Sequence, residues 1–245
     1  MTYYAVLASI PIAVVSAFFI HWFTLRSVTT GKARLEISRG VYLGFSFQIV
    51  IFAGLLFYLG KSVFLAPLFA VGFSILGDWF NLHFPVALKN NGEPLIGGIV
   101  SFAMAQLFYI SAFFQLTPWN SVYTGVIPYV VTLVFLILPA VIFYFRVYNP
   151  KRPKPIMIFA FVYGLVLCFF VSLAVNAFIA FGGYWIFLML GGLVFLLSDA
   201  VMGETTIHGG RHPVWEFQVP WITYLIAQSL LLIGFFLLSH TMVGH

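Results

Sequence analysis

Long apolar runs, separated by short polar connections, are the feature that most constrains how this chain can fold. Each run has roughly 18–25 residues, enough for a helix to cross about 30 Å of hydrocarbon. None of the runs shows the alternation of polar and apolar residues that marks a membrane-spanning β-strand. Only 7% of the 245 residues are charged, compared with about a quarter in an average soluble domain. The sequence therefore predicts an all-α, polytopic membrane protein.

Eight such runs follow one another, and no linker-like segment or separate soluble domain interrupts them. We therefore expect a single domain over residues 1–245, built as an eight-transmembrane-helix bundle. The predicted spans cover residues 3–25, 40–59, 62–82, 95–115, 122–145, 155–178, 182–203 and 219–240.

The positions of the cations predict how these spans are oriented. With eight spans, the connections after odd-numbered spans share one side of the membrane. Only Lys61, of the 11 Lys and Arg residues, falls outside those connections. The positive-inside rule places the cation-rich side in the cytoplasm and both termini on the non-cytoplasmic side. The net charge of +5 then reflects membrane topology and does not indicate nucleic-acid binding. The remaining cations are Arg26, Lys32, Arg34, Arg39, Lys89, Arg146, Lys151, Arg152, Lys154 and Arg211.

Two aspartates lie inside spans, Asp78 in the third and Asp199 in the seventh. Both spans run toward the cytoplasm, and each aspartate comes about four residues before the cytoplasmic end, or roughly 6 Å below the interface. A charged aspartate costs ~2.5–3.5 kcal/mol at the bilayer centre and less near its edge. The negative end of the helix dipole adds to this cost. We expect at least one of the two to be protonated near neutral pH, so that they could act as a general acid and base.

The two aspartates also fit roles other than acid–base catalysis. Either one could reach water from one turn below the membrane boundary, or pair with an arginine in a loop. Intramembrane acids also serve in proton relays, so the alternative function is a non-enzymatic proton-coupled carrier or lipid transporter. A transport site is expected near the midplane, whereas both aspartates are predicted to lie in the cytoplasmic half.

Small and polar residues inside the spans predict a tightly packed bundle. Buried amides and hydroxyls need partners in lipid, so they should face the interior, either joining helices or lining a pocket. Glycines inside spans allow helices to approach closely. We expect this of Gly72, Gly77, Gly97, Gly98, Gly191 and Gly192.

A metal site is not expected. His208 and His212 have the spacing of two ligands on one helical face, but glycines between them and a following proline predict a loop. The single cysteine, Cys168, cannot form an intramolecular disulfide or a cysteine-based zinc site.

Four short motifs together resemble the YhhN-like lysoplasmalogenase family over nearly the whole chain. They are GDWFNL at residues 77–82, GxxxFxxAQLFYI at 98–110, GGLVFLLSD at 191–199 and YLIAQSL at 224–230. The resemblance implies an intramembrane hydrolase that cleaves the sn-1 vinyl ether of a lysoplasmalogen. The products are a fatty aldehyde and glycerophosphoethanolamine or glycerophosphocholine.

The family's two motif aspartates correspond to Asp78 and Asp199. At Gln106 the family usually has a histidine, and a glutamine cannot shuttle protons as a histidine does. Either that position serves only in hydrogen bonding, or this chain differs in activity or substrate.

The chemistry of vinyl ether hydrolysis agrees with this resemblance. Protonation of the alkene carbon farther from the ether oxygen needs an acid, the resulting oxocarbenium ion needs a nearby anion, and the attacking water needs a base. No nucleophilic serine, metal or other cofactor is required. We therefore predict that Asp78 and Asp199 are catalytic, with the acid and base roles left open. The predicted substrate-binding residues are Ser74, Asn81, Gln106, Tyr109, Ser198, Tyr224 and Gln228.

The expected partners are a lysophospholipid and the lipid bilayer, with the oligomeric state open. We expect the headgroup at the cytoplasmic leaflet, where Lys32, Arg34 or Lys89 could meet the phosphate. A bacterial inner membrane and the endoplasmic reticulum both fit such a multi-pass protein.

Overall fold

The computed structural model of the chain describes residues 31–60, 65–81, 94–209 and 218–242, and most of these residues are helical. Within these ranges there is no strand, so the predicted all-α class is confirmed. The α-helices are α2 (Gly31–Gly60), α3 (Leu65–Asn81), α5 (Pro94–Leu116), α6 (Trp119–Val122), α7 (Ile127–Ile142), α8 (Lys154–Phe181), α9 (Trp185–Met202) and α10 (Gln218–Met242). Two π-helical turns continue helices that precede them, η2 (Phe143–Val147) after α7 and η3 (Gly203–His208) after α9.

Five of the described helices are long and apolar enough to cross a membrane. They cover Pro94–Leu116, Ile127–Val147, Lys154–Phe181, Trp185–His208 and Val219–Ser239. Two shorter apolar helical stretches, Leu43–Tyr58 and Leu65–Asn81, coincide with the second and third predicted spans. The chain is therefore an integral membrane protein with several spanning helices. The predicted span 3–25 lies outside the described residues, so the count of eight and the side of the termini stay predictions.

Helix ends differ from the predicted span ends for local reasons. Helix α2 begins at Gly31, although the apolar span was predicted from residue 40. Lysine, arginine and glutamate are good helix formers, so apolarity marks the membrane-crossing part of the helix and not its start. Helix α7 begins at Ile127 instead of residue 122, because Gly125 turns the chain with a φ of 78°. Pro128, in the first turn of α7, then suits a helix start.

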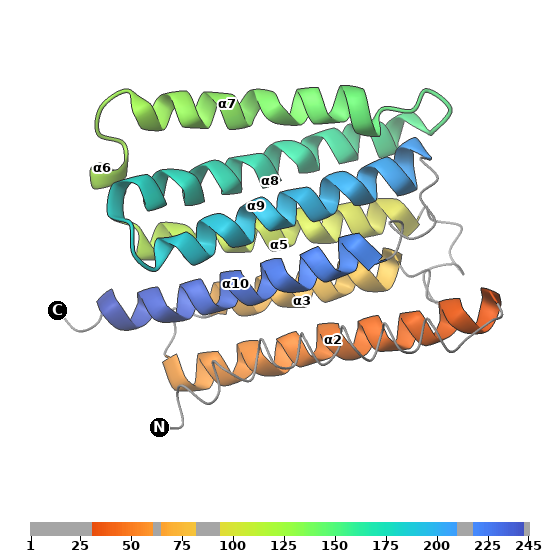
Figure 1. Cartoon of the computed structure of the whole chain (residues 1–245), viewed down its shortest axis with the longest axis horizontal. Coiled ribbons are helices and arrows are strands. Elements are labelled where there is room, and N and C mark those ends of the chain that lie inside the picture. Colours follow the sequence, from red (N-terminus) through yellow and green to blue (C-terminus); the bar gives the residue numbers. More distant parts are fainter. Residues whose placement is uncertain (1–30, 61–64, 82–93, 210–217, 243–245) are drawn as a thin grey trace.

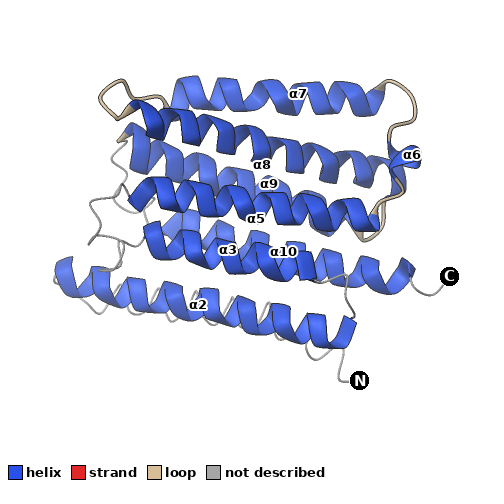
Figure 2. Ribbon diagram, turned by 180° about the vertical axis from the view of Figure 1, so that it is seen from behind, coloured by secondary structure: helices blue, strands red, loops and turns tan. Residues whose placement is uncertain are grey.

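The helices form a layered bundle with α7 at one edge and α2 at the other (Figures 1 and 2). Helix α8 packs against α5, α7 and α9, while α3 pairs with α5 and α9 pairs with α10. The core between these helices is rich in stacked rings. The ring centroids of Tyr109 and Phe235 are 5.8 Å apart, and Tyr109 also stacks on Phe170. Helix α7 carries many exposed apolar side chains, including Leu133 and Ile137, as expected for an outer helix in lipid.

Several glycines stand where two helices approach closely. A Cβ at Gly191 would lie 2.9 Å from the side chain of Leu231 and 3.1 Å from its backbone nitrogen. A Cβ at Gly77 would lie 2.6 Å from the Phe102 ring. Gly97, Gly98 and, at ordinary contact distance, Gly192 also face side chains of neighbouring helices, so the predicted packing role is confirmed for these residues. It is wrong for Gly72, which is exposed and would have nothing within 4 Å of a Cβ.

We predict opposite effects of alanine at Gly191 and Gly72. Gly191→Ala should lower the free energy of unfolding by about 1–3 kcal/mol, because the new methyl group meets backbone on α10 that cannot rotate away. Gly72→Ala should be neutral or stabilising by about 0.5–1 kcal/mol, since it removes a helix-interior glycine without a clash. Thermal unfolding of both variants in the same detergent measures the difference. Equal stability would contradict the close approach of α9 and α10.

Candidate active site

The C-terminal ends of α3 and α9 meet inside the bundle. The side-chain amide of Asn81, the last residue of α3, donates to the sulfur of Met202, the last residue of α9, at 3.5 Å. Asp78 and Asp199 each lie three residues before these ends. The two aspartates therefore stand at the same depth, as their positions in the spans predicted. They lie within electrostatic range of each other.

Asp78 is held by hydroxyl groups from two other helices. Its side chain is 1% exposed, and its Oδ2 accepts hydrogen bonds from Ser46 Oγ on α2 at 2.8 Å and from the Tyr224 hydroxyl on α10 at 3.1 Å. A buried carboxyl without such partners would be strongly destabilising. One carboxyl therefore joins three helices, α2, α3 and α10.

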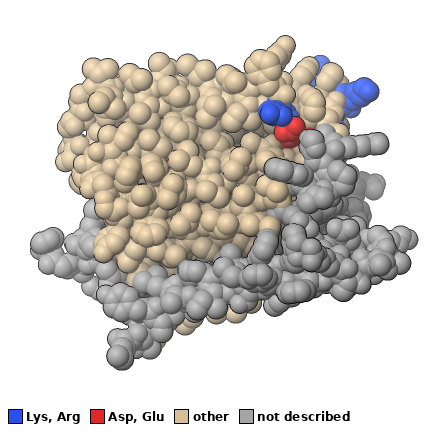
Figure 3. All heavy atoms as spheres, in the orientation of Figure 1, with Lys and Arg blue, Asp and Glu red and all other residues tan. Residues whose placement is uncertain are grey.

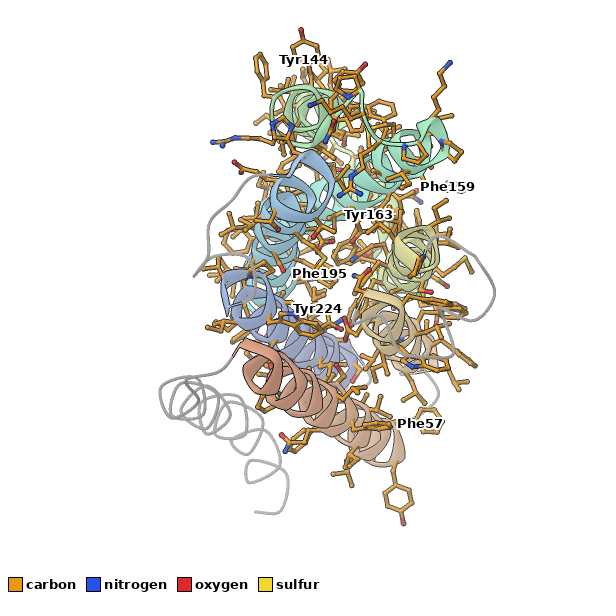
Figure 4. The ribbon with its side chains drawn as sticks, turned by 90° about the vertical axis from the view of Figure 1, so that its right-hand side faces the viewer. Phe57, Tyr144, Phe159, Tyr163, Phe195 and Tyr224 are labelled. Carbon is orange, nitrogen blue, oxygen red and sulfur yellow. The ribbon has the colours of Figure 1, made fainter. Side chains whose placement is uncertain are left out.

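The carboxyl of Asp199 differs from that of Asp78 in its hydrogen-bond partner and in its exposure. It is partly exposed, and its Oδ2 accepts a hydrogen bond from the hydroxyl of Tyr163 on α8. Both residues line a partly open, mostly apolar cavity of about 90 Å³, whose wall comes mainly from α5, α7, α8 and α9. A cavity of this size has room for several waters, each needing roughly 10–15 Å³. Figure 4 shows Tyr163 directed into the interior of the bundle, in contrast to Tyr144 at the periphery.

Apolar side chains form most of the cavity wall. They include Phe102, Ile142, Phe143, Leu167 and Leu196, and both π-helical turns contribute residues. The hydroxyl, amide and carboxyl groups in the wall belong to Asn81, Tyr163, Asp199 and Thr206. The wall therefore combines a mostly apolar surface with a few polar groups, as small-molecule sites do.

Aromatic rings stand between Asp78 and the cavity. Phe102 lines the cavity, and the Tyr224 ring packs edge-on against Phe102, with centroids 5.9 Å apart. Phe195 completes the cluster at 5.6 Å from Tyr224, and Figure 4 shows Phe195 and Tyr224 along the same interior seam as Tyr163. The structure thus brings the two aspartates to one depth but gives only Asp199 a place in the cavity wall.

The other predicted binding residues fall into separate groups. Asn81 lines the cavity. Tyr109 donates to Gln228 Oε1, and Gln228 Nε2 donates to Ser74 Oγ at 2.9 Å, so these three residues join α3, α5 and α10. Ser198 donates to the backbone carbonyl of Pro220 at 2.7 Å and ties α9 to α10. Their roles in substrate binding stay predictions.

Gln106 is fully buried, yet neither atom of its amide group has a hydrogen bond of ordinary geometry to the described residues. It lies against the Tyr163 hydroxyl. An unsatisfied buried polar group costs about 1–3 kcal/mol. A polar ligand or water at this position would remove that cost.

Tyr163 was missed by the sequence analysis, because one tyrosine carries little signal in a chain that is 20% aromatic. The depth of Tyr163 in the bundle, which matches that of Asp199, could have identified it. Tyr163 lies nine residues after Lys154, which begins α8, and Asp199 lies nine residues before His208, which ends η3 at the same end of the bundle. His208 itself was predicted in a loop, but it belongs to η3 and its Nδ1 lies 2.9 Å from the Tyr148 carbonyl oxygen. His212 lies outside the described residues, which hold no group of three potential metal ligands.

The fold and site define a polytopic helical membrane protein with a carboxyl–tyrosine pair in the wall of an apolar cavity. The family model of the YhhN family matches residues 42–235. The chain therefore belongs to the YhhN family, as the four motifs suggested. No curated protein and no solved structure matches it.

We predict that Tyr224→Phe destabilises the fold through Asp78. The ring stays in its aromatic cluster, but the Asp78 carboxyl loses one of its two donors, at a cost of about 1–3 kcal/mol. Tyr58→Phe is the control, because Tyr58 is 85% exposed. Thermal unfolding should show a lower midpoint for Tyr224→Phe alone, and equal midpoints would mean that the hydrogen bond adds nothing to stability.

Proposed function

We propose that this protein is a lysoplasmalogenase-like membrane hydrolase that cleaves the sn-1 vinyl ether of a lysoplasmalogen. The observation that carries the proposal is the Asp199 carboxyl in the wall of a mostly apolar cavity, in a chain of the YhhN family. The products are a fatty aldehyde and the glycerophospho-headgroup alcohol. Acid–base chemistry by carboxyl groups is sufficient for this reaction.

In the proposed reaction, Asp199 in its neutral form donates its proton to the β-carbon of the vinyl ether, which is the alkene carbon farther from the ether oxygen. The carbon–carbon π bond breaks, a carbon–hydrogen bond forms, and the neighbouring carbon becomes an oxocarbenium ion. Water then forms a bond to that carbon and gives a proton back to the Asp199 carboxylate. The hemiacetal collapses when its carbon–oxygen bond to glycerol breaks, its hydroxyl proton leaves and the glycerol oxygen takes up a proton. The net change is the addition of one water.

Asp78 completes the proposed catalytic pair without touching the substrate. Its Oδ2 receives hydrogen bonds from two hydroxyls, an arrangement suited to a carboxylate. In its ionised form, Asp78 would stabilise the oxocarbenium ion across a medium of low dielectric constant. Asp199 is therefore the proposed acid and base, and Asp78 the proposed electrostatic partner.

The charges at one end of the bundle suggest how the substrate is oriented. Four cations, Arg146, Lys151, Arg152 and Lys154, lie in and beside the turn that joins η2 to α8. On the face shown in Figure 3, the described charged side chains gather at this end. Arg152 donates to the backbone carbonyl of Thr206, a cavity residue. This arrangement favours a phosphate at this end and the alkenyl chain in the cavity.

The distance between Asp199 on α9 and Thr206 on η3 fits such a substrate. Asp199 and Thr206 are seven residues apart, which is roughly 10 Å along a helix. In a lysoplasmalogen, seven bonds separate the phosphorus from the β-carbon of the vinyl ether, or about 8–9 Å when extended. Lys32, Arg34 and Lys89, the cations predicted for the phosphate, have side chains outside the described part of the chain and stay predictions.

We predict that the purified protein releases fatty aldehyde from a lysoplasmalogen and not from an acyl lysophospholipid. Asp199→Asn should lower the rate by about 10²–10⁴-fold, because no acid remains in the cavity. Asp78→Asn should lower it by about 10²-fold through loss of the fixed charge. Mass spectrometry of the aldehyde measures each rate.

Glu204→Gln is the matched control, because it makes the same chemical change at a carboxyl paired with Arg146 outside the cavity wall. If Asp78→Asn and Asp199→Asn both fold normally and keep wild-type rates, the catalytic pair is wrong. If the wild-type protein turns over no lipid but takes up solute in proteoliposomes under a pH gradient, it is a proton-coupled carrier.

We predict that the cationic end recognises the phosphate. The KM should be lower for the lysoplasmalogen than for the corresponding alkenylglycerol, which lacks phosphate. A double variant, Lys151→Gln with Lys154→Gln, should raise the KM of the phosphate-bearing substrate by about 3–10-fold, as loss of exposed charge interactions implies. Raised ionic strength should reduce the difference in KM between the lysoplasmalogen and the alkenylglycerol. An equal KM change for both substrates would contradict phosphate recognition at this end.

A further inference from the structure

The hydroxyl of Tyr163 donates a hydrogen bond to the carboxyl of Asp199. We propose that Tyr163 is a positioning residue that fixes the Asp199 carboxyl and stabilises the anion left after Asp199 gives up its proton. This inference rests on the proposed function and assigns a role to a residue that no motif identified.

The Tyr163 ring is anchored on both sides. It packs against the two hydrophobic clusters of the protein, one of which extends across the bundle while the other includes Ile156 and Ile207 beside the cavity. A packed tyrosine ring leaves its hydroxyl little freedom, because the side chain has only two main torsions. The hydroxyl is therefore held where it meets Oδ2 of Asp199.

This contact selects which carboxyl oxygen can react. Tyr163 occupies Oδ2, so Oδ1 is the oxygen left to present a proton to a substrate in the cavity. An aspartate on an open helix face could rotate about its terminal torsion. The hydrogen bond removes this freedom, and correct orientation is a large part of the advantage of an enzymatic acid.

The same contact is stronger in the transition state than in the ground state. A hydrogen bond to an ionised carboxylate is roughly twice as strong as one between neutral groups. As the proton moves from Asp199 to the vinyl carbon, negative charge develops on the carboxyl that Tyr163 already contacts. Only interactions that strengthen in this way accelerate the chemical step.

Gln106 adds a third residue to the hydrogen-bonded pair of Tyr163 and Asp199. Because Tyr163 donates its single proton to Asp199, its oxygen is left as an acceptor, and the unpartnered Gln106 amide lies against it. An amide hydrogen from Gln106 toward the Tyr163 oxygen would polarise the hydroxyl further, because linked hydrogen bonds strengthen one another. Such a contact would give the fully buried Gln106 amide on α5 a polar partner.

The test is Tyr163→Phe, which keeps the ring and removes only the hydroxyl. We expect kcat for lysoplasmalogen to fall by about 10²-fold, as it does when one preorganised donor is lost. KM should change little, and so should the Kd of a saturated alkyl-ether lysophospholipid that cannot be hydrolysed. Gln106→Met should give a smaller loss of kcat, again without a loss of binding.

Tyr123→Phe is the matched control. Its hydroxyl contacts Thr132 Oγ1 at 3.3 Å on α7, away from the cavity, so kcat should not change. An unchanged kcat in Tyr163→Phe would overturn the inference. So would a loss of binding in proportion to kcat. A loss of kcat well beyond the ~10³-fold limit for one preorganised donor would make Tyr163 the proton donor itself, which also overturns the positioning role.

An infrared measurement separates this inference from the proposed function. The carboxyl band that disappears in Asp199→Asn should shift in Tyr163→Phe and stay in place in Tyr123→Phe, whether or not any lipid is hydrolysed. Absence of aldehyde release with a shifted band would reject the lysoplasmalogenase function alone. A band that does not move would reject the Tyr163 contact, and this measurement also applies to a variant of reduced stability.

Discussion

The site depends on one requirement of the bilayer, that every buried polar group finds a partner within the protein. Asp78 meets this requirement with hydroxyls from α2 and α10, and so brings three helices together at one point. Tyr224, one of these donors, also packs against Phe102 in the cavity wall. One donor to the first carboxyl is therefore also part of the packing behind the cavity wall.

The carboxyl of Asp199 meets the same requirement in a different way. Asp199 has a tyrosine for a partner and a cavity beside it, so it keeps access to molecules that Asp78 cannot reach. Two chemically identical side chains at one depth thus acquire different surroundings. This is the arrangement that separates an acid from an electrostatic partner in other acid–base sites.

The sequence predicted the helical class, most of the helices and the common depth of the two aspartates, because each follows from apolar run length and position along a span. It could not predict that Phe102 and Tyr224 stand between Asp78 and the cavity, since that depends on how α5 and α10 rotate about their axes. The hydrogen-bonded group of Ser74, Tyr109 and Gln228 arises for the same reason. Their types and depths suggested a pocket, whereas packing turned them toward one another. Residue type did not distinguish Tyr163, because its neighbours on α8 are mostly apolar or aromatic, and only its depth relative to Asp199 could have identified it.

The outer position of α7 has a consequence for how a substrate arrives. This helix and η2 form one wall of the cavity, yet α7 packs mainly against α8. The outer face of α7 is exposed and apolar, so it meets the bilayer. For the lipid substrate proposed above, the relevant concentration is then its mole fraction in the membrane plane. Dilution of that plane with inert lipid or detergent would slow turnover even when the amount of substrate per volume stays constant.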